Sequence, residues 1–474
     1  MGIINSIAQV MINIASWFWG IPILILIGGG GLYFSLRLGF VQIRHFGYIC
    51  SQTFGKMFGN NKDQAEGEVS AFAAACTALA SSIGASNIVG VPTAIALGGP
   101  GAVFWIWILA ILGMATKYVE VTLGIMYREK NEEGDWVGGP YYYCKKGLGG
   151  PIGTIFGVGF AFFLMIELIP SIATQSASAT TQFEVFGIDQ KIVAIVMAII
   201  VVIVCIGGVK RIGSVCDKLV PLMATVYLVG ALVIIFMHIS EVPAAFAMIF
   251  KDAFTGKAAT GGFAGATFAM AVRWGAARGV YSNEAGMGTA PIGHAAANVD
   301  HPIRQGMWGV FEVTVDTIIV CTVTALAVLV SGVWTEPGAS ANPGPLAQMA
   351  FASGFGATFS NMFVSICVFL FVLSTVIVVV FYGERQAEFL FGRKFAKIWR
   401  WMYIVAVIVG GIGINLATLY SLTDFFLGLI LVPNMITILI LAPKVKKAQD
   451  EFFHTPGKYY MADMEAKKAK KADK

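Results

Sequence analysis

An apolar segment that runs from about Val69 to Leu97 is interrupted at its middle by residues that disfavour a membrane helix. The interruption is rich in glycine, serine and asparagine and reads Ser81-Ser82-Ile83-Gly84-Ala85-Ser86-Asn87-Ile88-Val89-Gly90-Val91-Pro92. Backbone that leaves a helix inside a bilayer finds no water to bond, so it is tolerated only where it is buried in protein or faces a ligand or a water-filled space. We therefore interpret the interruption as the break of a discontinuous membrane helix and as a candidate site.

The composition indicates a polytopic membrane protein with an all-α fold. Of the 474 residues 57% are hydrophobic and 12% are charged, whereas a soluble domain has roughly 25% charged residues. A membrane-spanning helix needs about 20 predominantly apolar residues. On that rule we predict about eleven transmembrane helices, near 14–36, 71–97, 101–127, 152–181, 191–209, 218–238, 262–282, 307–333, 356–382, 400–417 and 420–442.

The distribution of basic residues predicts the orientation. With the N-terminus outside, the outer loops keep only Lys191, Lys251 and Lys257, and the other basic residues that flank the spans lie inside. That asymmetry follows the positive-inside rule. We expect a multi-pass protein of the cell membrane with a transmembrane domain over 1–442 and a basic cytoplasmic tail over 443–474. We expect the tail to be disordered against anionic headgroups, or to be merely solubilising.

A second interruption predicts an internal repeat. The seventh span carries Arg273-Trp274-Gly275 near its middle. About fifteen residues separate Val69 from the first break and about thirteen separate Gly261 from the second, roughly 20 Å each at 1.5 Å per residue. A matched pair of interrupted helices points to an inverted-repeat transporter site. We predict one extra span at 14–36, a first repeat over about 69–240 and a second over about 261–442.

The first break offers groups for both an anion and a cation. Gly84 can adopt positive φ and lets a ligand approach the backbone. The amides around Ala85 and Ser86 begin the outer half-helix, where a carboxylate is favoured. Asn87 adds an amide oxygen suited to a hard cation. The alternative is a close helix crossing, because small residues also mediate helix association in membranes.

Two further polar clusters lie inside predicted spans. Ser374 and Thr375 fall near the middle of the ninth span and can add two oxygen ligands to a cation, or can bond back to their own helix. Gln175 lies in the fourth span among serine and threonine residues. We expect that face to line a cavity, with hydrogen bonding between helices as the alternative.

Acidic residues in the eighth span suggest an inner gate. Glu312 and Asp316 lie four residues apart near its start. A buried charge needs a partner, and the basic residues within reach are Arg273, Arg278 and Arg304. We prefer a breakable ion-pair network at the cytoplasmic side over a static structural one.

Three other ionisable residues fall inside spans, where such residues are functional candidates. Lys117 and Glu120 are three residues apart on one helix and can neutralise each other. Glu167 has no obvious partner in the sequence. It is either a proton-coupling carboxylate or a side chain that reaches a polar neighbour.

Enzymatic motifs do not occur. The sequence contains no HExxH motif and no phosphate-binding GxxxxGK motif, and its cysteines lack metal-ligand spacing. We expect a protein that is not an enzyme and has no organic cofactor. Its expected partner is the lipid bilayer, with neither nucleic acid nor an obligate protein partner.

Several longer motifs carry a family resemblance. They include Gly98-Gly99-Pro100-Gly101-Ala102-Val103-Phe104-Trp105-Ile106-Trp107 after the first break, Gly113-Met114-Ala115-Thr116-Lys117-Tyr118, and Ala277-Arg278-Gly279-Val280-Tyr281-Ser282-Asn283-Glu284-Ala285-Gly286. In these motifs, and over nearly its whole length, the chain resembles the sodium:alanine (alanine or glycine:cation) symporter family. The resemblance implies eleven helices with a LeuT-type 5+5 core and import of alanine or glycine with co-transported Na⁺.

The resemblance also implies site residues. The substrate is expected on Gly84, Ala85, Ser86, Ile172, Gln175, Val272, Trp274 and Gly275, with its carboxylate on the amides of 84–86 and its ammonium near the carbonyls of 272 and 274. Sodium is expected at the carbonyls of Ala80 and Ile83 with Asn87, Ser374 and Thr375. The cytoplasmic gate is expected to comprise Arg278, Glu284, Glu312 and Asp316.

Some positions depart from the family pattern. The break usually reads Gly-Thr-Gly-Asn in the family, and here Ala85 and Ser86 replace its two middle residues. Val379 stands where a tryptophan is common, and loss of a large aromatic wall enlarges a pocket. A carrier for a bulkier neutral amino acid, and a proton-coupled carrier, are therefore the alternatives to sodium-coupled import of alanine or glycine.

Overall fold

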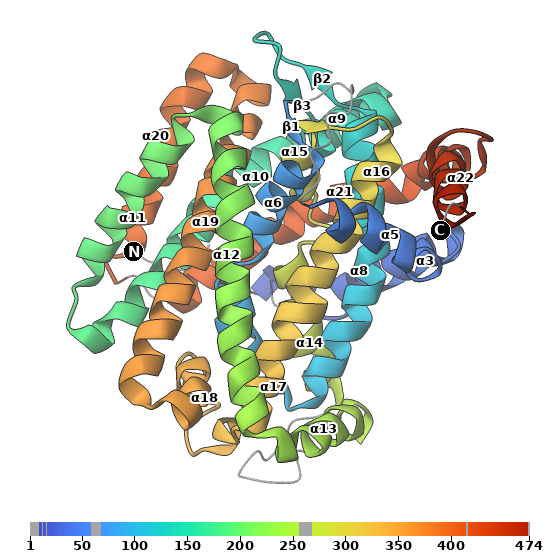
Figure 1. The fold of residues 1–474 in the computed structure, drawn as a ribbon. Helices are drawn as coiled ribbons and strands as arrows, with labels where there is room; N and C mark the ends of the chain where they lie inside the picture. Colours follow the sequence, from blue (N-terminus) through green and yellow to red (C-terminus); the bar gives the residue numbers. More distant parts are fainter. Residues whose placement is uncertain are drawn as a thin grey trace.

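The computed structural model describes residues 9–57 apart from 12 and 16, 68–255, 268–413 and 416–472, and this part of the chain is almost entirely helical (Figure 1). The start of the predicted seventh span, including Gly261, lies outside the described residues.

The elements follow one another in this order. The helices are α2 (Ile21–Leu24), α3 (Gly30–Arg37), α4 (Val41–Arg44), α5 (Phe46–Gln52), α6 (Ala71–Ser82), α7 (Val91–Gly98), α8 (Gly101–Met126), α9 (Pro140–Tyr142), α10 (Gly150–Thr180), α11 (Gln190–Cys205), α12 (Gly208–Met237), α13 (Val242–Thr255), α14 (Phe268–Asn283), α15 (Ala290–His294), α16 (Pro302–Val313), α17 (Thr322–Val330), α18 (Leu346–Phe355), α19 (Ala357–Phe391), α20 (Arg393–Gly410), α21 (Leu416–His454) and α22 (Tyr459–Ala472). Short strands β1 (Val69–Ser70) and β4 (Ala297–Asn298) pair in parallel, and β2 (Glu129–Lys130) and β3 (Trp136–Val137) pair antiparallel.

Six helices are long and apolar enough to cross a membrane, and the broken pair α6–α7 makes a seventh. Four predicted spans do not meet this criterion in the described part of the chain. Two correspond to the shorter apolar helices Ile21–Arg37 and Gln190–Cys205, one is described only from Phe268, and α20 begins with four basic residues within eight positions. The predicted number of eleven is therefore not confirmed.

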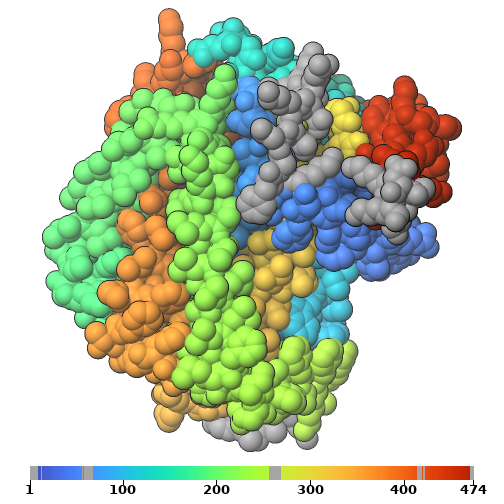
Figure 2. Space-filling view, in the orientation of Figure 1, coloured from blue at the N-terminus to red at the C-terminus, as the bar shows by residue number. Residues whose placement is uncertain are grey.

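The outer helices carry an apolar surface. Large side chains such as Ile195 and Ile199 on α11, and Leu222, Val229 and Phe236 on α12, are between 48% and 66% exposed. Both helices lie on the face shown in Figure 2, where they are green. A patch of this kind is unfavourable in water but matches the hydrocarbon of a bilayer.

Helix packing at the centre depends on small residues. Helix α8 packs against α14 and α16, and α10 packs against α19, α20 and α21. A Cβ atom at Gly309 would lie 3.0 Å from the carbonyl oxygen of Lys117, and one at Gly410 would lie 2.5 Å from that of Ala173. Glycine therefore allows these helices to approach closely, as is common in membrane proteins.

The first break is confirmed. Helix α6 ends at Ser82, Ile83 adopts an extended conformation, and the chain resumes at Ser86 in a π-helical turn that leads into α7. The two half-helices are bent by 48°. Gly84 is not among the glycines with positive φ, so its importance lies in the space that it leaves.

The second break lies elsewhere than predicted. Helix α14 is continuous through 273–275, and the break falls at 284–289, between α14 and α15. Glu284, Gly286 and Gly288 have φ of 54°, 92° and 79°, which no α-helix accommodates. Gly275 serves packing instead, because a Cβ atom there would lie 2.5 Å from the carbonyl oxygen of Ala102. The stretch 273–275 is therefore a place where α14 crosses α8 closely, and it is not a helix break.

Each half of the first broken helix packs against one half of the second broken helix. Helix α7 packs on α14, and α6 packs on α15. Strand β1 leads into α6, and its partner β4 follows α15, so the pairing holds these two half-helices at the same end of the molecule. The two breaks consequently lie next to each other in the interior.

The C-terminal region differs from the disordered tail that we expected. Helix α21 continues past 443 to His454, and α22 extends to Ala472 (Figure 1). The aromatic rings of Phe452, Phe453, Tyr459 and Tyr460 pack against one another and against His45, Tyr48 and His301. The lysines suggested a solvated tail, whereas these aromatic side chains provide enough apolar surface to fold it back.

One carboxylate holds α22 in place. Asp463 Oδ2 accepts hydrogen bonds from the Tyr48 hydroxyl at 2.5 Å and from Arg304 Nη1 at 3.1 Å. Burial, followed by this hydrogen bond, raises the pKa of the Tyr48 phenol, which therefore remains a donor at neutral pH.

We predict that Asp463→Ala loosens α22. Loss of these two hydrogen bonds should destabilise the docked helix by about 1 kcal/mol, which should accelerate trypsin cleavage after Lys467 and Lys468. Limited proteolysis followed by mass spectrometry measures this rate. Asp450→Ala is the control, because the ion pairs of Asp450 in the described part of the chain are with the exposed side chains of Lys446 and His454 on α21 itself. Equal cleavage of the two variants would contradict the prediction.

Candidate functional site

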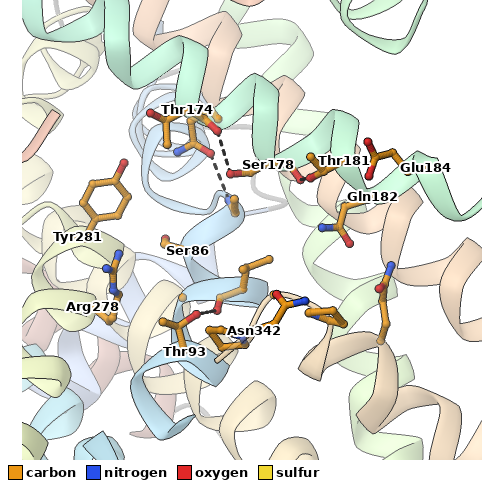
Figure 3. Close-up of a pocket in the computed structure, with 18 of the residues that line it drawn as sticks. Ser86, Thr93, Thr174, Ser178, Thr181, Gln182, Glu184, Arg278, Tyr281 and Asn342 are labelled. Carbon is orange, nitrogen blue, oxygen red and sulfur yellow. Dashed lines mark hydrogen bonds between the residues drawn. The ribbon is translucent and has the colours of Figure 1, made fainter. Parts of the chain in front are cut away.

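The first break forms the base of a cavity of about 710 Å³. Figure 3 shows Arg278 and Tyr281 of α14 on one side of it, Thr174 and Ser178 of α10 on the other, and Ser86 between them. The lining residues are Ala85, Ser86, Val89, Gly90, Thr93, Thr174, Gln175, Ser178, Thr181, Gln182, Glu184, Val185, Arg278, Tyr281, Ala341, Asn342, Pro343, Gly344, Pro345 and Gln348. The cavity thus extends from the break to the loop before α18, at the end of the molecule where α13 and α18 lie (Figure 1).

The backbone amides at the break have side-chain partners. Asn87 Oδ1 accepts from the Gly84 amide at 3.0 Å, and Gln175 Oε1 accepts from the Ala85 amide at 3.4 Å. The latter distance is long for a hydrogen bond, so an anionic ligand can displace it at little cost. Gln175 therefore lines the cavity, as the sequence predicted, and contacts the break.

Gly84 leaves room for two side chains. A Cβ atom at this position would lie 3.0 Å from Thr375 Oγ1 and 3.3 Å from Gln175 Nε2. These atoms belong to α19 and α10, so the two helices approach the backbone at one point. A larger residue would force them apart.

Oxygen atoms gather on the other side of the break. Thr375 Oγ1 donates a hydrogen bond that three carbonyl oxygens share, those of Ala80 at 2.9 Å, Phe371 at 3.0 Å and Ile83 at 3.3 Å. The Ser374 hydroxyl donates to the Phe371 carbonyl at 2.8 Å and approaches Met223 Sδ at 3.5 Å. The structure therefore brings Ala80, Ile83 and Thr375 together as predicted, with Ser374 joined through Phe371.

The Phe371 carbonyl was not predicted. It lies three and four residues before the hydroxyl pair, which is the spacing at which serine and threonine bond back to their own helix. That spacing is the signal that could have identified it. We call the five atoms Ala80 O, Ile83 O, Phe371 O, Ser374 Oγ and Thr375 Oγ1 the oxygen cluster. Such neutral oxygens are the ligands that hard monovalent cations favour.

Asn87 is bound away from this cluster. Its Nδ2 atom donates to Asp316 Oδ1 at 2.7 Å, while its oxygen is engaged with the Gly84 amide. Asp316 Oδ2 accepts from the hydroxyls of Ser282 at 2.6 Å and Thr317 at 2.7 Å. Asn87 therefore ties the first break to α14 and to the π-helical segment Thr314–Cys321.

The predicted gate residues do not form one network. Asp316 lies in the cluster around Asn87, whereas Arg278 lines the large cavity and its guanidinium lies 5.4 Å from the centre of the Trp274 ring. Arg304 is paired with Asp300 and Asp463. Glu312 lies near the end of α16 and Asp316 lies in the π-helical segment that follows it, and the two side chains contact different neighbours, so their spacing in the sequence was misleading.

Glu312 has a different cation from those predicted. Lys117 Nζ lies 3.6 Å from Glu312 Oε2 and donates to the carbonyl oxygen of Asn283 at 2.8 Å. His294 hydrogen-bonds the other oxygen of Glu312, and Gln305 Nε2 lies 2.6 Å from His294 Nδ1. These buried side chains pack around Asn283, the last residue of α14.

Lys117 is thus not the partner of Glu120, although the two lie three residues apart. Glu120 accepts from Asn434 Nδ2 at 2.6 Å and from the Gly286 amide at 3.2 Å. The amide of Gly286 lies in the second break and has no helical partner, so it needs an acceptor. Glu120 is turned toward the break because it supplies this acceptor.

Five of the predicted substrate residues do not line the large cavity, namely Gly84, Ile172, Val272, Trp274 and Gly275. Ile172 is fully buried, and Val272, Trp274 and Gly275 belong to the continuous part of α14. The carbonyls of an unbroken helix accept bonds from amides four residues on, so those of 272 and 274 are not free for an ammonium group. The ammonium contact at 272 and 274 therefore stays a prediction, and the continuous helix does not favour it.

Comparisons with known proteins complete the description of the site. Residues 4–466 match the sequence profile of the sodium:alanine symporter family. An uncharacterized transporter of Bacillus subtilis, YflA, is 48% identical over 97% of this chain and 96% of its own. The sodium/alanine symporter AgcS of Methanococcus maripaludis is 39% identical over 91% of this chain and 94% of its own. A crystal structure of the Eremococcus coleocola manganese transporter, 14% identical, shares the fold with a TM-score of 0.51 over 84% of this chain and 83% of that one.

We predict that Gly84→Ala impairs the site without unfolding the protein. Crowding by one methyl group costs about 1–3 kcal/mol, and here it falls on Thr375 and Gln175. Solute uptake by reconstituted protein should drop by roughly tenfold or more while the melting temperature changes little. Gly159→Ala on α10 is the control, because nothing lies within 4 Å of its added Cβ atom. Normal uptake by the Gly84 variant would refute the prediction.

Proposed function

Because the chain belongs to the sodium:alanine symporter family, we propose that it imports a small neutral amino acid together with sodium across the cell membrane. The observation that carries the proposal is the oxygen cluster on one side of the first break, with the large cavity reaching Ala85 and Ser86 on the other. One surface of the break offers carbonyl oxygens for a cation, and the other offers amides for a carboxylate.

The oxygen cluster is the proposed sodium site. The last carbonyls of a helix have no partners within the helix, and they carry the negative end of its dipole. Ala80 and Ile83 supply such carbonyls where α6 ends. Hydroxyl groups can rotate to present a lone pair to an ion, so Ser374 and Thr375 can exchange their bonds to Phe371 for ligation of sodium.

The amides of Ala85 and Ser86 are the proposed site for the substrate carboxylate. They begin the outer half-helix, where backbone donors and the helix dipole favour an anion. Displacement of Gln175 Oε1 from the Ala85 amide would free this glutamine to contact the substrate. Alanine or glycine is the primary candidate, and a bulkier neutral amino acid is the alternative because Val379 stands where a tryptophan is common in the family.

Alternating access is the proposed mechanism. The pairing of α6 with α15 and of α7 with α14 supports two inverted repeats of five helices behind an extra first helix, eleven in all. The positive-inside rule places the end with Arg128, Lys145 and Arg385 in the cytoplasm, with both the N-terminus and the large cavity directed outward. The buried group of Lys117, His294 and Glu312 then belongs to the inner gate.

The test is uptake of labelled alanine, glycine and larger neutral amino acids into proteoliposomes under an inward sodium gradient, an inward proton gradient or neither. We expect accumulation above equilibrium only with the sodium gradient. Accumulation driven by protons alone would replace the proposal by the proton-coupled alternative. Flux that merely equilibrates the solute would indicate a channel and refute coupling.

We predict that the double variant Ser374→Ala, Thr375→Ala weakens sodium dependence selectively. The sodium concentration for half-maximal uptake should rise by roughly tenfold or more, because two ligands are lost. Substrate affinity at saturating sodium should change much less. Thr375→Ser, which retains the hydroxyl, is the control. Unchanged sodium dependence of the double variant would remove the oxygen cluster as the sodium site.

A further inference from the structure

A second, smaller cavity lies next to the oxygen cluster. Its volume is about 40 Å³, enough for one small hydrated group or ion. Ser81, Ser82, Ser86, Glu167, Leu168, Ser171, Gln175, Tyr281, Glu284, Met287, Thr289, Thr375, Val379 and Leu427 line it. Two carboxylates and seven hydroxyl-bearing residues, half of the fourteen that line it, therefore surround a space that Thr375 shares with the oxygen cluster.

One of these carboxylates has an unused oxygen. Glu167 lies in the middle of α10 and is 2% exposed, and its Oε1 atom has no hydrogen-bond partner. A buried polar atom without a partner costs free energy, and the cost is larger for a charged group. The atom belongs to a residue that lines the small cavity, so a ligand in that cavity is the group that would satisfy it.

The hydrogen bonds to the side chain of the other carboxylate, among the described residues, come from hydroxyls. Glu284 Oε2 accepts from Thr289 at 2.5 Å and from Ser81 at 3.1 Å. Lys117, the fully buried lysine of this region, is engaged with Asn283 O and Glu312. Among the described residues that line the cavity, none is lysine or arginine. Two carboxylates thus share a small space without a basic side chain.

The contrast with Asp316 shows why this arrangement points to a ligand. Both oxygens of Asp316 accept hydrogen bonds, from Asn87, Ser282 and Thr317, and they are satisfied within the protein. Glu167 and Glu284 instead face a space. Buried charges of one sign require a compensating charge.

We propose that the small cavity binds one monovalent cationic group between Glu167 and Glu284. Carboxylate and hydroxyl oxygens suit both a sodium ion and the three donors of an ammonium group. The group is therefore either a second co-transported sodium ion or the ammonium group of the amino acid. The inference rests on the proposed function and gives the ammonium group a site that the unbroken part of α14 does not provide.

The test uses the full-length purified protein with the variants Glu167→Gln and Glu284→Gln. Binding of radioactive sodium without substrate, and alanine affinity at saturating sodium, are measured on the same samples. If sodium is the occupant, both variants bind one sodium ion fewer per chain. If the ammonium group is the occupant, sodium binding is unchanged and alanine affinity falls by roughly tenfold or more.

Controls separate a ligand site from a structural role. Glu241→Gln, on an exposed 3₁₀ turn, should leave both measurements unchanged. Glu167→Asp retains the charge and should recover part of the binding lost in Glu167→Gln, which a general folding defect would not allow. The melting temperature of each variant is recorded to identify unfolded samples.

Two outcomes would overturn the inference. In the first, neither sodium binding nor alanine affinity changes in properly folded variants. In the second, only the pH dependence of uptake changes, which would mean that the cavity holds a proton. Either result leaves the proposed function intact when wild-type uptake is driven by sodium. Absence of sodium-driven uptake in the wild type would refute the proposed function itself.

Discussion

The structure depends on how the backbone is satisfied where α6 ends. Carbonyl oxygens at Ala80 and Ile83 leave the helix in a region without bulk water, and Thr375 of α19 supplies their donor. Amides at Gly84 and Ala85 find acceptors on Asn87 and on Gln175 of α10. Because each unpaired group would be costly, α10 and α19 must approach the break from two sides. Gly84 makes that approach sterically feasible.

The two breaks are connected through shared partners. Asn87 hydrogen-bonds Ser282 at 3.2 Å, and Ser81 hydrogen-bonds Glu284, so polar contacts pass directly from one broken helix to the other. Lys117 fixes the carbonyl oxygen of Asn283 at the end of α14. A change in the contacts of the first break therefore alters hydrogen bonds that also hold the second break. Packed elements with two discrete arrangements are the usual means by which such a local change becomes a movement of whole helices.

Glycine has two different uses in this protein, and the sequence does not distinguish them. Gly275 lets α14 lie against the backbone of α8 and stays helical, whereas Gly286 and Gly288 adopt positive φ and end a helix. Both uses occur beside polar or aromatic residues. The same ambiguity affects charge, since Lys117 and Glu120 share a helix but reach separate neighbours. Side-chain direction depends on which elements surround the helix, and that is a tertiary property.

The sequence by itself determined that the chain is an all-helical membrane protein and that one helix breaks near 84–86, and the family resemblance predicted that Ala80, Ile83, Gln175 and Thr375 lie beside that break. The first two inferences rest on apolar length and on a local run of small and polar residues, and the third rests on motifs shared with the family. Only the tertiary structure decided that the second break lies at 284–289, that α22 folds back onto Tyr48 and Arg304, and that Glu167 and Glu284 face one cavity. Each of these depends on contacts between residues more than a hundred positions apart, or on the space that neighbouring helices leave, and no local pattern encodes either.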